Sequence, residues 1–521
     1  MRSCLLPIVS ACCVFCSGLV AAAAQPEASG LLLHMQGRVE KSPGSGQFEV
    51  VSKTVRWEPR KTAVIICDMW ARHWCDGACK RGAEMASRMN QFVAEARRRG
   101  VLIVHAPSGG MQHYADHPAR RRAKDAPKAA NLPEGMGAGC KQIPSEKKAT
   151  WPIDQSDGGC DDQPRCPNRT MDLHQTAAIE IRDEDAISDS GVECWNLFEA
   201  RGIKNVVLVG VHTNMCVIGR PFGLRNMVRS GKNVALVRDL TDTMYNSRQP
   251  PNVPHVAGTD LILEYIEKYV CPTITSGQLL GGPALRFAED KRPNVVLVVW
   301  EDEYDAARSL TGLAGLLRDR YGCRCAVLVG EEGRGIAGLE ELEAADLMVL
   351  FARRKTLPGD QLDRIRKYLD AGKPLVALRT ASHAFSVRGQ TPQGLAQWPE
   401  FDGEVLGGNY HGHGGNKQGT DVAEVPEAAG QAILAGVEPK KWHSAGSLYL
   451  ASPVDPKTTV LLRGSFDGKT EPVAWTRRYK GGRVFYTSLG HSEDFKLPQF
   501  QRLAVNAVFW AMDRSVPKAH Q

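Results

Sequence analysis

The chain has 521 residues, 43% of them hydrophobic and 24% charged, with a formal net charge of +7. The length exceeds that of one ordinary domain, and the composition excludes a disordered or fibrous protein. The basic residues are scattered apart from one cluster, at 120–122 and Lys124, which is typical of a solvated face. We therefore expect two or three globular domains and no nucleic-acid partner.

Residues 1–24 have the pattern of a signal peptide. Arg2 supplies a positive start, residues 5–20 an apolar stretch, and the alanines at 21–24 a cleavage site before Gln25. The apolar stretch is too short for a comfortable membrane span. We therefore expect an exported protein, periplasmic or extracellular. Residues 9–12, Val-Ser-Ala-Cys, resemble a bacterial lipobox, and a lipid anchor at Cys12 is the alternative.

The expected export of the protein affects which state its cysteines adopt. Four of the 15 lie in the leader, and the remaining eleven are an odd number, so at least one is free or pairs between chains. Cys75 and Cys79 lie close together, and Cys140, Cys160 and Cys166 share one irregular segment. In an oxidising compartment we expect disulfides among them. A zinc knuckle is the alternative, but the spacing fits no standard zinc pattern, so we assign no metal.

The first half of the chain alternates short apolar runs with helical patterns. Residues 25–58 carry little pattern and are interpreted as a lead-in. We expect strands over 62–67, 101–104, 178–181, 206–209 and 234–237, and helices over 84–99, over 190–201 and after Cys216. Residues 107–175, rich in Pro, Gly, Asp and Cys, are interpreted as an insertion held by cysteines. Short Val/Ile/Leu runs between helices predict buried parallel strands.

The second half repeats this alternation after an expected linker at 276–292. We expect strands over 295–299, 347–350 and 375–378, and helices over 310–320 and 361–370. The predicted organisation is a signal peptide at 1–24, an α/β domain at 59–275, the linker, and a second α/β domain at 293–515. Each domain is expected to have three α/β/α layers around a mainly parallel sheet.

Two predicted strands end in residues that suit nucleophilic catalysis. Cys216 follows the strand at 206–209 after the turn His-Thr-Asn-Met, where the first amides of a helix favour a thiolate. Asp68 follows the strand at 62–67, so both residues face one crevice of a parallel sheet. The carboxylate can take the thiol proton and return it to a departing amine, while the amides of Met215 and Cys216 hold an oxyanion. A core cysteine and a helix-capping aspartate are the structural alternatives.

Residues 65–70 and 210–217 resemble the motifs of isochorismatase-like cysteine hydrolases, a family that includes nicotinamidases and carbamoyl-amide hydrolases. The resemblance covers roughly residues 59–272. It implies a Rossmann-type fold, Cys216 as nucleophile, Asp68 as base, and a cis peptide bond before His212 that shapes the turn. The family's third catalytic residue is a lysine at the end of the strand before the helix that precedes the nucleophile strand. Arg182 is assigned to that position here, as an electrostatic partner, because arginine cannot be deprotonated.

Other polar residues of the first half are weighed against structural roles. Some family members bind a metal through Asp and His, but surface histidines are the commoner explanation here, so no metal and no cofactor are assigned; the candidates are His73, His105, His113 and His117. After the nucleophile, Arg220 or Arg225 can meet a substrate carboxylate. We expect a structural role for Arg225 and leave Arg220 open.

Four segments of the second half, 377–385, 407–413, 472–477 and 482–493, resemble ThuA-like domains of the trehalose-utilisation type. These are related in fold to the flavodoxin-like class I glutamine amidotransferases, which place a cysteine after a strand and a His-x-Glu pair later. This chain keeps the pair but has Thr-Ala-Ser at 380–382, so the cysteine-dependent reaction is excluded. The expected lining of a sugar or metal pocket is His383, His411, His413, His491 and Glu493, with a polar structural network as the alternative.

The sequence therefore predicts an exported cysteine hydrolase that cleaves a C–N bond of a small amide, fused to a carbohydrate-associated domain. The expected partners are the amide, a carbohydrate ligand and further copies of the chain. Both catalytic patterns are incomplete, with Lys replaced by Arg in one domain and Cys absent from the other. The alternative is therefore a catalytically degenerate ligand- or carbohydrate-binding protein of the envelope.

Overall fold

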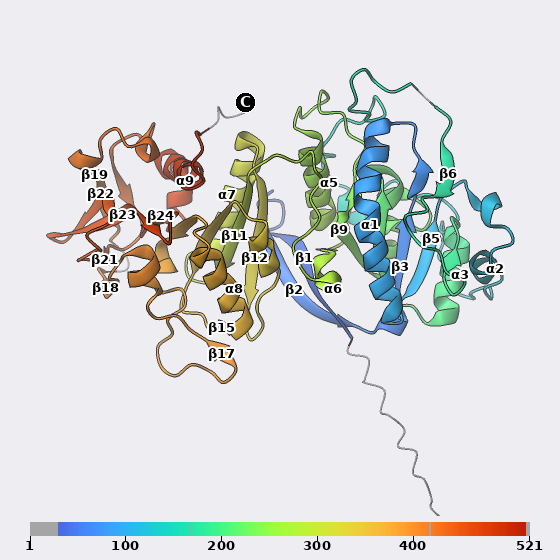
Figure 1. Ribbon diagram of the computed structural model, residues 1–521, viewed down its shortest axis with the longest axis horizontal. Coiled ribbons are helices and arrows are strands. Elements are labelled where there is room, and N and C mark those ends of the chain that lie inside the picture. The colour runs from blue at the N-terminus through green and yellow to red at the C-terminus, as the bar shows by residue number, and fades with distance from the viewer. Residues whose placement is uncertain (1–29, 168, 416–417, 517–521) are drawn as a thin grey trace, which may run out of the picture.

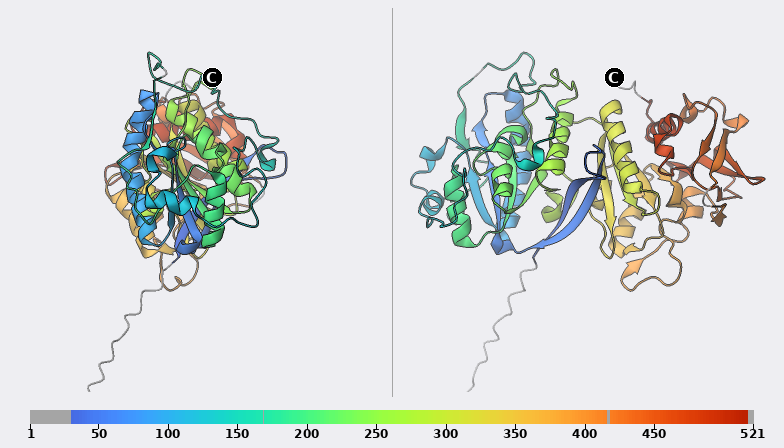
Figure 2. Two further views of the ribbon diagram at one scale, coloured as in Figure 1. Left: turned by 90° about the vertical axis from the view of Figure 1, so that its right-hand side faces the viewer. Right: turned by 180° about the vertical axis from the view of Figure 1, so that it is seen from behind.

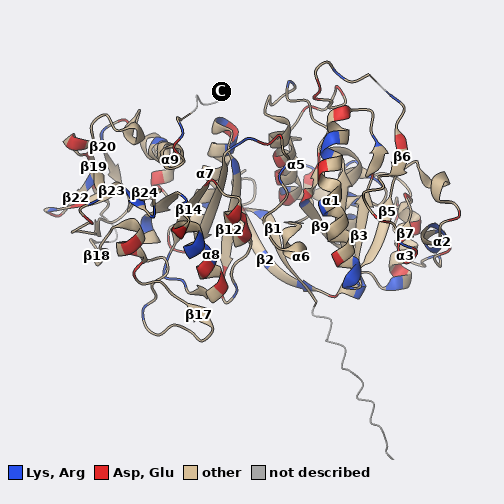
Figure 3. Ribbon diagram, viewed as in Figure 1, with Lys and Arg blue, Asp and Glu red and all other residues tan. Residues whose placement is uncertain are grey.

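The computed structural model describes residues 30–167, 169–415 and 418–516, so the expected signal peptide and Cys12 lie outside the described residues. Two α/β units lie side by side along the long axis of the molecule (Figure 1). Acidic and basic positions are interspersed over both units (Figure 3). Within the described ranges, no helix combines the length and apolar character needed to cross a bilayer.

An eight-stranded sheet in the order β2-β1-β10-β9-β8-β3-β5-β7 forms the centre of the first unit. Its strands are β1 (Leu31–Glu40), β2 (Phe48–Trp57), β3 (Thr62–Cys67), β5 (Leu102–Ala106), β7 (Ala186–Ile187), β8 (Asn205–Val211), β9 (Asn233–Asp242) and β10 (Thr273–Ile274). In this sheet order, every pair of neighbouring strands from β10 to β7 is parallel. Strands β1 and β2 form an antiparallel hairpin, and β1 pairs antiparallel with β10. Every residue of β3 and β8 is buried, as central strands covered on both faces require.

Helices cover both faces of this sheet. They are α1 (Asp76–Arg98), α2 (Pro118–Lys124), α3 (Gly191–Arg201), α4 (Leu224–Arg229), α5 (His255–Tyr269) and α6 (Gly277–Leu280). Helix α1 packs its apolar side, including Met89 and Phe92, on one face. Phe198 of α3, Met227 of α4 and Ile266 of α5 pack on the other. The three-layer arrangement predicted for this unit is therefore confirmed.

Two predictions for the first unit are wrong. Residues 31–57, interpreted as part of a lead-in, form the ten-residue strands β1 and β2. Residues 178–181 form no strand, because side chains bind their backbone instead: Gln175 Nε2 donates to the Ile179 carbonyl at 3.1 Å, and the Glu180 amide donates to Asn90 Oδ1 at 3.0 Å. The strand before α3 is β7, so Arg182 precedes this strand and does not end it.

The insertion at 107–175 is held without disulfides. It contains α2 and ends in β6 (Asp172–Gln175), which pairs antiparallel with β4 (Trp70–Arg72). All eleven cysteines in the described part of the chain are free thiols. The disulfides expected among Cys75, Cys79, Cys140, Cys160 and Cys166 are therefore absent from this structure.

The second unit contains a ten-stranded sheet in the order β13-β12-β11-β14-β16-β24-β23-β22-β19-β20. Its strands are β11 (Asn294–Trp300), β12 (Arg324–Glu331), β13 (Gly335–Ile336), β14 (Leu347–Ala352), β16 (Leu375–Leu378), β19 (Thr420–Glu424), β20 (Lys441–Ser444), β22 (Thr459–Phe466), β23 (Lys469–Tyr479) and β24 (Gly482–Thr487). The strands from β12 to β24 are parallel, and those beyond β24 alternate in direction.

Helices also cover both faces of the second sheet. Helices α7 (Ala306–Tyr321) and α9 (Pro498–Ala511) pack on one face, and α8 (Gly359–Asp370) packs on the other. Short strand pairs lie outside the sheet: β15 (Leu357–Pro358) with β17 (Leu395–Ala396), and β18 (Gly412–His413) with β21 (Tyr449–Leu450). The second unit thus repeats the predicted α/β/α layers and extends them with an antiparallel half.

The β1–β2 hairpin joins the two units (Figure 2). Strand β2 contacts α7 and β12 of the second unit. The Val50 amide donates to Thr311 Oγ1 at 3.1 Å, and the Thr54 amide donates to Glu331 Oε2 at 3.1 Å. Val50 belongs to the core cluster that contains α7. The hairpin is therefore part of the interface as well as of the first sheet.

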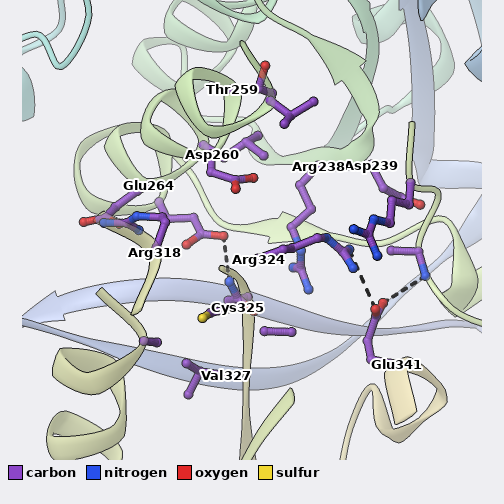
Figure 4. A pocket seen from close by; sticks show the side chains of 18 of the residues that line it. Arg238, Asp239, Thr259, Asp260, Glu264, Arg318, Arg324, Cys325, Val327 and Glu341 are labelled. Carbon is purple, nitrogen blue, oxygen red and sulfur yellow. Dashed lines mark hydrogen bonds and ion pairs between the residues drawn. The ribbon is translucent and has the colours of Figure 1, made fainter. Parts of the chain in front are cut away.

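Beside the hairpin, a cavity of about 150 Å³ lies between the units (Figure 4). Six arginines and six carboxylates line it. Arg292 Nη1 pairs with Asp260 at 2.7 Å, and Arg318 of α7 pairs with Glu264 of α5. Because the opposite charges balance and pair across the interface, we interpret this lining as an ion network between the units.

Candidate active site

The nucleophile turn begins where β8 passes close to β3. Gly210 has φ +108°, and a Cβ added there would lie 2.0 Å from the Cys67 carbonyl oxygen, so only glycine fits. One residue further on, the Val211–His212 peptide bond is cis, as the family resemblance implied. His212 is buried, and burial lowers the pKa of its ring to about 3, so the imidazole is neutral at physiological pH.

The turn itself, Thr213–Val217, is a single π-helical turn, a geometry that is frequent at functional sites. Side chains fix it to the end of β9. Thr213 Oγ1 donates to the Asp242 carbonyl at 2.9 Å. Asn214 Nδ2 donates to the Met244 carbonyl at 2.9 Å, and the Met244 amide donates back to Asn214 Oδ1 at 3.0 Å. These bonds hold the backbone around Cys216 in one conformation.

Asp68 reaches the crevice from the end of β3. Its side chain is fully buried, and the Ser108 amide donates to Oδ1 at 2.7 Å. Arg220 Nε and Nη2 both donate to Oδ2, each at 3.3 Å. Burial raises the pKa of Asp68 above its usual value, although Arg220 acts to lower it. A carboxylate with a raised pKa is a better general base than an exposed aspartate.

Cys216 lies beside both charged groups. Burial and the Asp68 charge raise the pKa of the thiol to about 12, and Arg220 only partly opposes them. Burial and the Asp68 charge therefore favour the thiol over the thiolate that was expected at this turn. The thiol is protonated at neutral pH and needs a base to become nucleophilic.

The cation of this site is Arg220 and not Arg182. Arg182 is half-exposed and its guanidinium pairs with Glu180 at 3.0 Å; within the described residues it makes no bond to Asp68. Arg220 lies four residues after Cys216, and its amide donates to the Cys216 carbonyl at 3.0 Å. A spacing of four places two residues on one side of a helical turn, and this was the signal in the sequence.

The structure places three further groups to which the sequence assigned a role, and only the Met215 amide differs from its expected role. The Met215 amide, expected in an oxyanion hole, donates to the His212 carbonyl at 3.0 Å. The Cys216 amide has no partner outside its own turn in the part of the chain that is described. Arg225 pairs with the buried carboxylate of Glu146 at 2.7 Å, in line with the structural role expected for it.

A second cluster of aromatic and basic side chains lies at the end of β16. Arg379 is almost fully buried at φ +44°, with its guanidinium 4.3 Å from the ring centre of Tyr304 and 4.7 Å from that of Tyr449. Its Nη1 donates to the Ser488 carbonyl at 2.7 Å. Cation–π contact with two rings offsets part of the cost of burying this charge.

Two predicted histidines lie at this cluster. His383 is buried and stacks on Tyr410 with ring centres 4.4 Å apart, and burial lowers its pKa to about 3. Tyr410 contacts Tyr449, with centres 4.8 Å apart. His491 packs edge-on against Tyr304 at 5.7 Å. The tyrosines and Arg379 were missed in the sequence because they come from segments far apart in the chain, such as β21 for Tyr449 and the turn after β16 for Arg379.

The other predicted pocket residues lie at the surface. His411 and His413 are exposed, although the His413 ring is 6.3 Å from that of Tyr449. The Glu493 carboxylate accepts from Lys496 at 2.7 Å, and only the Glu493 amide reaches His491, at Nδ1. His491 and Glu493 therefore do not form an imidazole–carboxylate pair.

The comparisons with known proteins give one family match. Residues 295–511 match the family model of ThuA, trehalose utilisation. No curated protein matches the chain. The ThuA resemblance of the second unit is thus confirmed.

Solved structures similar to the chain include relatives of both resembled families. A ThuA-like protein from Parabacteroides merdae is 20% identical, with a TM-score of 0.36 over 44% of this chain and 93% of its own. A cysteine hydrolase from Pseudomonas syringae is 18% identical, with a TM-score of 0.28 over 43% and 94%. An isochorismatase family protein from Burkholderia thailandensis is 15% identical, with a TM-score of 0.25 over 42% and 93%.

Proposed function

We propose that the first unit of this protein, joined to a second unit that matches the ThuA family, is an exported hydrolase that cleaves the C–N bond of a small amide. One observation carries the proposal: the thiol of Cys216, the desolvated carboxylate of Asp68 and the guanidinium of Arg220 meet at the carboxyl ends of β3 and β8. Such an edge of a parallel sheet is where α/β enzymes bind their ligands.

In the first half of the proposed reaction, the Asp68 carboxylate takes the proton of Cys216 while Sγ attacks the amide carbon. Asp68 is suited to this because its pKa is raised by burial while the thiol is protonated. The carbonyl oxygen becomes an oxyanion, and the Cys216 amide of the turn donates a hydrogen bond to it. Collapse of the intermediate breaks the C–N bond, and protonated Asp68 returns its proton to the leaving amine.

In the second half, a water molecule attacks the thioester carbon and gives its proton to Asp68. The C–S bond breaks, the carboxylic acid leaves, and the proton returns to the sulfur. Arg220 holds the Asp68 carboxylate at the start of each half and remains beside the sulfur when the negative charge has moved there. The cycle thus consumes one amide and one water, and yields one acid and one amine.

We further propose that the second unit binds a carbohydrate at its aromatic cluster. Tyr304, Tyr410 and His491 are only partly buried, so ring surface remains next to the Arg379 guanidinium. Binding sites for small molecules commonly combine aromatic walls with a few fixed polar groups. Calorimetric titration with a panel of sugars tests this: Tyr410→Ala should weaken any binding at least tenfold, and unchanged affinity would move the site elsewhere.

Ammonia release from a panel of small amides and ureides tests the hydrolase. Wild-type protein should release ammonia from at least one compound, and Cys216→Ala and Asp68→Asn should abolish it. Cys271→Ser is the matched control, because Cys271 is another buried cysteine of the same unit whose pKa burial raises. A folded wild type that hydrolyses nothing would favour the non-catalytic binding protein instead.

A further inference from the structure

Three cysteines and one aspartate converge where the insertion meets the start of α1. Cys75 immediately precedes α1, and Cys160, Asp162 and Cys166 come from the insertion. The three sulfurs and a carboxylate oxygen all lie within 4.8 Å of one another. All three thiols donate to the same atom, Asp162 Oδ2, at 3.2, 3.7 and 3.1 Å from Cys75, Cys160 and Cys166.

We propose that Cys75, Cys160, Cys166 and Asp162 bind one Zn²⁺ ion as a structural site. In a tetrahedral zinc site, Zn–S bonds of about 2.3 Å and Zn–O bonds of about 2.0 Å place sulfur and oxygen roughly 3.5 Å apart. The three distances from Asp162 Oδ2 to sulfur lie close to this separation. A disulfide would join only two of the three sulfurs. It would not explain why the third buried thiol and the Asp162 carboxylate lie at the same point.

The number and burial of the ligands indicate a structural ion. Four protein ligands fill a tetrahedral shell and leave no open position for a substrate. Cys75 and Cys160 are 1% exposed and Cys166 is 8% exposed. Metal binding releases thiol protons, and the affinity should therefore rise with pH.

The surroundings of the cluster suit an anionic set of ligands. The Asp76 amide donates to Cys166 Sγ at 3.3 Å, and the Gly77 amide donates to Asp162 Oδ2 at 2.8 Å. Both amides belong to the first turn of α1, whose dipole favours negative charge. Arg81, one turn further along, is 4% exposed; its Nε atom donates to Asp242 at 2.8 Å, and its Nη2 atom has no hydrogen-bond partner. Hydrogen bonds to ligand atoms are the usual outer support of metal sites.

The absence of a side chain at Gly77 leaves room for the Asp162 carboxylate. A Cβ added to Gly77 would lie 2.8 Å from Asp162 Oδ1, so a side chain there would displace the carboxylate. The cluster packs with Met244 and Met215, and Met215 adjoins Cys216. A bound ion would thus fasten the insertion to the wall of the nucleophile turn. This role does not depend on which reaction the crevice performs.

Metal content is the first test, made on the whole mature chain purified under reducing conditions from zinc-supplemented cells. Elemental analysis should find about one zinc per chain, and replacement by Co²⁺ should give the charge-transfer absorption of a thiolate-bound ion. Cys160→Ser and Cys166→Ser should lose both signals. Cys140→Ser is the control, since Cys140 is a buried cysteine of the same insertion whose thiol donates to the Gln142 carbonyl and lies outside the cluster.

A second measurement needs no variant and covers the case in which the serine variants fail to fold. A strong chelator should lower the melting temperature of the wild type, and added Zn²⁺ should restore it. Two results would overturn the proposal: folded wild type that takes up neither Zn²⁺ nor Co²⁺ when reduced, or protein isolated from its export compartment with a disulfide between two of these three cysteines. Neither readout uses enzymatic activity, so the zinc site and the hydrolase can fail independently.

Discussion

Asp68 and Arg220 form an ion pair in which the carboxylate is fully buried while 38% of the arginine side chain is exposed, with Nη2 and Oδ2 3.3 Å apart. The pair lies beside Cys216, and Arg220 is its positively charged member. Arg220, three residues after the nucleophile turn, thus occupies the electrostatic position for which the sequence suggested Arg182. The consequences of this exchange can be measured.

Replacement of Arg220 by glutamine should reduce kcat/KM about 100-fold, while Arg182→Gln should change it less than about twofold. Arg220 lowers the pKa of Asp68, so without it the carboxylate binds its proton more tightly. The base must be ionised to act, and the acid limb of the pH–rate profile should therefore move to higher pH in Arg220→Gln. Equal losses in the two variants would contradict this assignment.

Alkylation of Cys216 by iodoacetamide should be slow at pH 7 and should rise steeply above the ordinary thiol pKa of about 8.5. The reason is that burial, with the Asp68 charge, raises the pKa of the thiol to about 12. Asp68→Asn removes that charge and should speed alkylation at any one pH. Peptide mass spectrometry follows the site, and a wild-type rate that levels off below pH 8 would show a thiolate instead.

Gly210→Ala should destabilise the first unit by about 3 kcal/mol, because the new Cβ would meet the Cys67 carbonyl at 2.0 Å and the residue has a positive φ. Gly202→Ala is the control, since Gly202 also has a positive φ, +65°, but has open space around its Cβ position. It should cost about 1 kcal/mol. Urea unfolding measures both, and similar costs would mean that the close approach of β8 to β3 is relaxed in solution.

Asp185 should make the protein less stable in acid. Burial acts to raise the pKa of its carboxyl group, but bonds from His105 and Arg97 outweigh burial and hold it at about 2. A depressed folded-state pKa gives stability above the unfolded value of about 3.9, and this stability is lost as the pH falls toward 2. The contribution is about 2 kcal/mol at neutral pH.

The matched variant is Asp185→Asn, and the quantity to compare is the slope of unfolding free energy against pH. Between pH 4 and about 2, the free energy of unfolding should fall faster in the wild type than in the variant. At neutral pH the variant should be the less stable protein, because Arg97 loses the carboxylate with which it pairs. Parallel curves from urea titrations would show that Asp185 is not the carboxyl group responsible.

The parts of the fold that the sequence predicted well are continuous apolar runs. Strand β3 occupies the predicted residues because all six of its side chains are buried, and β8 contains the predicted run for the same reason. Asp68 and Cys216 could be found because each follows such a strand. Strands β1 and β2 were missed although β1 alternates, with Leu31, Leu33 and Met35 buried and more exposed residues between them; the period is interrupted only in β2, where Val50 and Val51 are adjacent.

The features that were missed depend on contacts between distant residues. A strand at 178–181 fits the local apolar pattern, but the side chains of Gln175 and Asn90 take its backbone bonds. Nothing in the sequence distinguishes Asp162 as a ligand beside Cys160 and Cys166. Its closeness to Cys75 is visible only in the folded structure. A ligand set that spans some ninety positions of sequence matches no spacing rule for zinc.

Strand β2 is the outermost strand of the first sheet, and the second unit lies against it. An outermost strand with unpaired backbone groups tends to recruit foreign strands, and proteins commonly cover such strands. Here the cover is supplied by the other half of the same chain, through the bonds of Val50 and Thr54 to Thr311 and Glu331. A first half produced without the second unit would therefore expose β2 and be prone to aggregate.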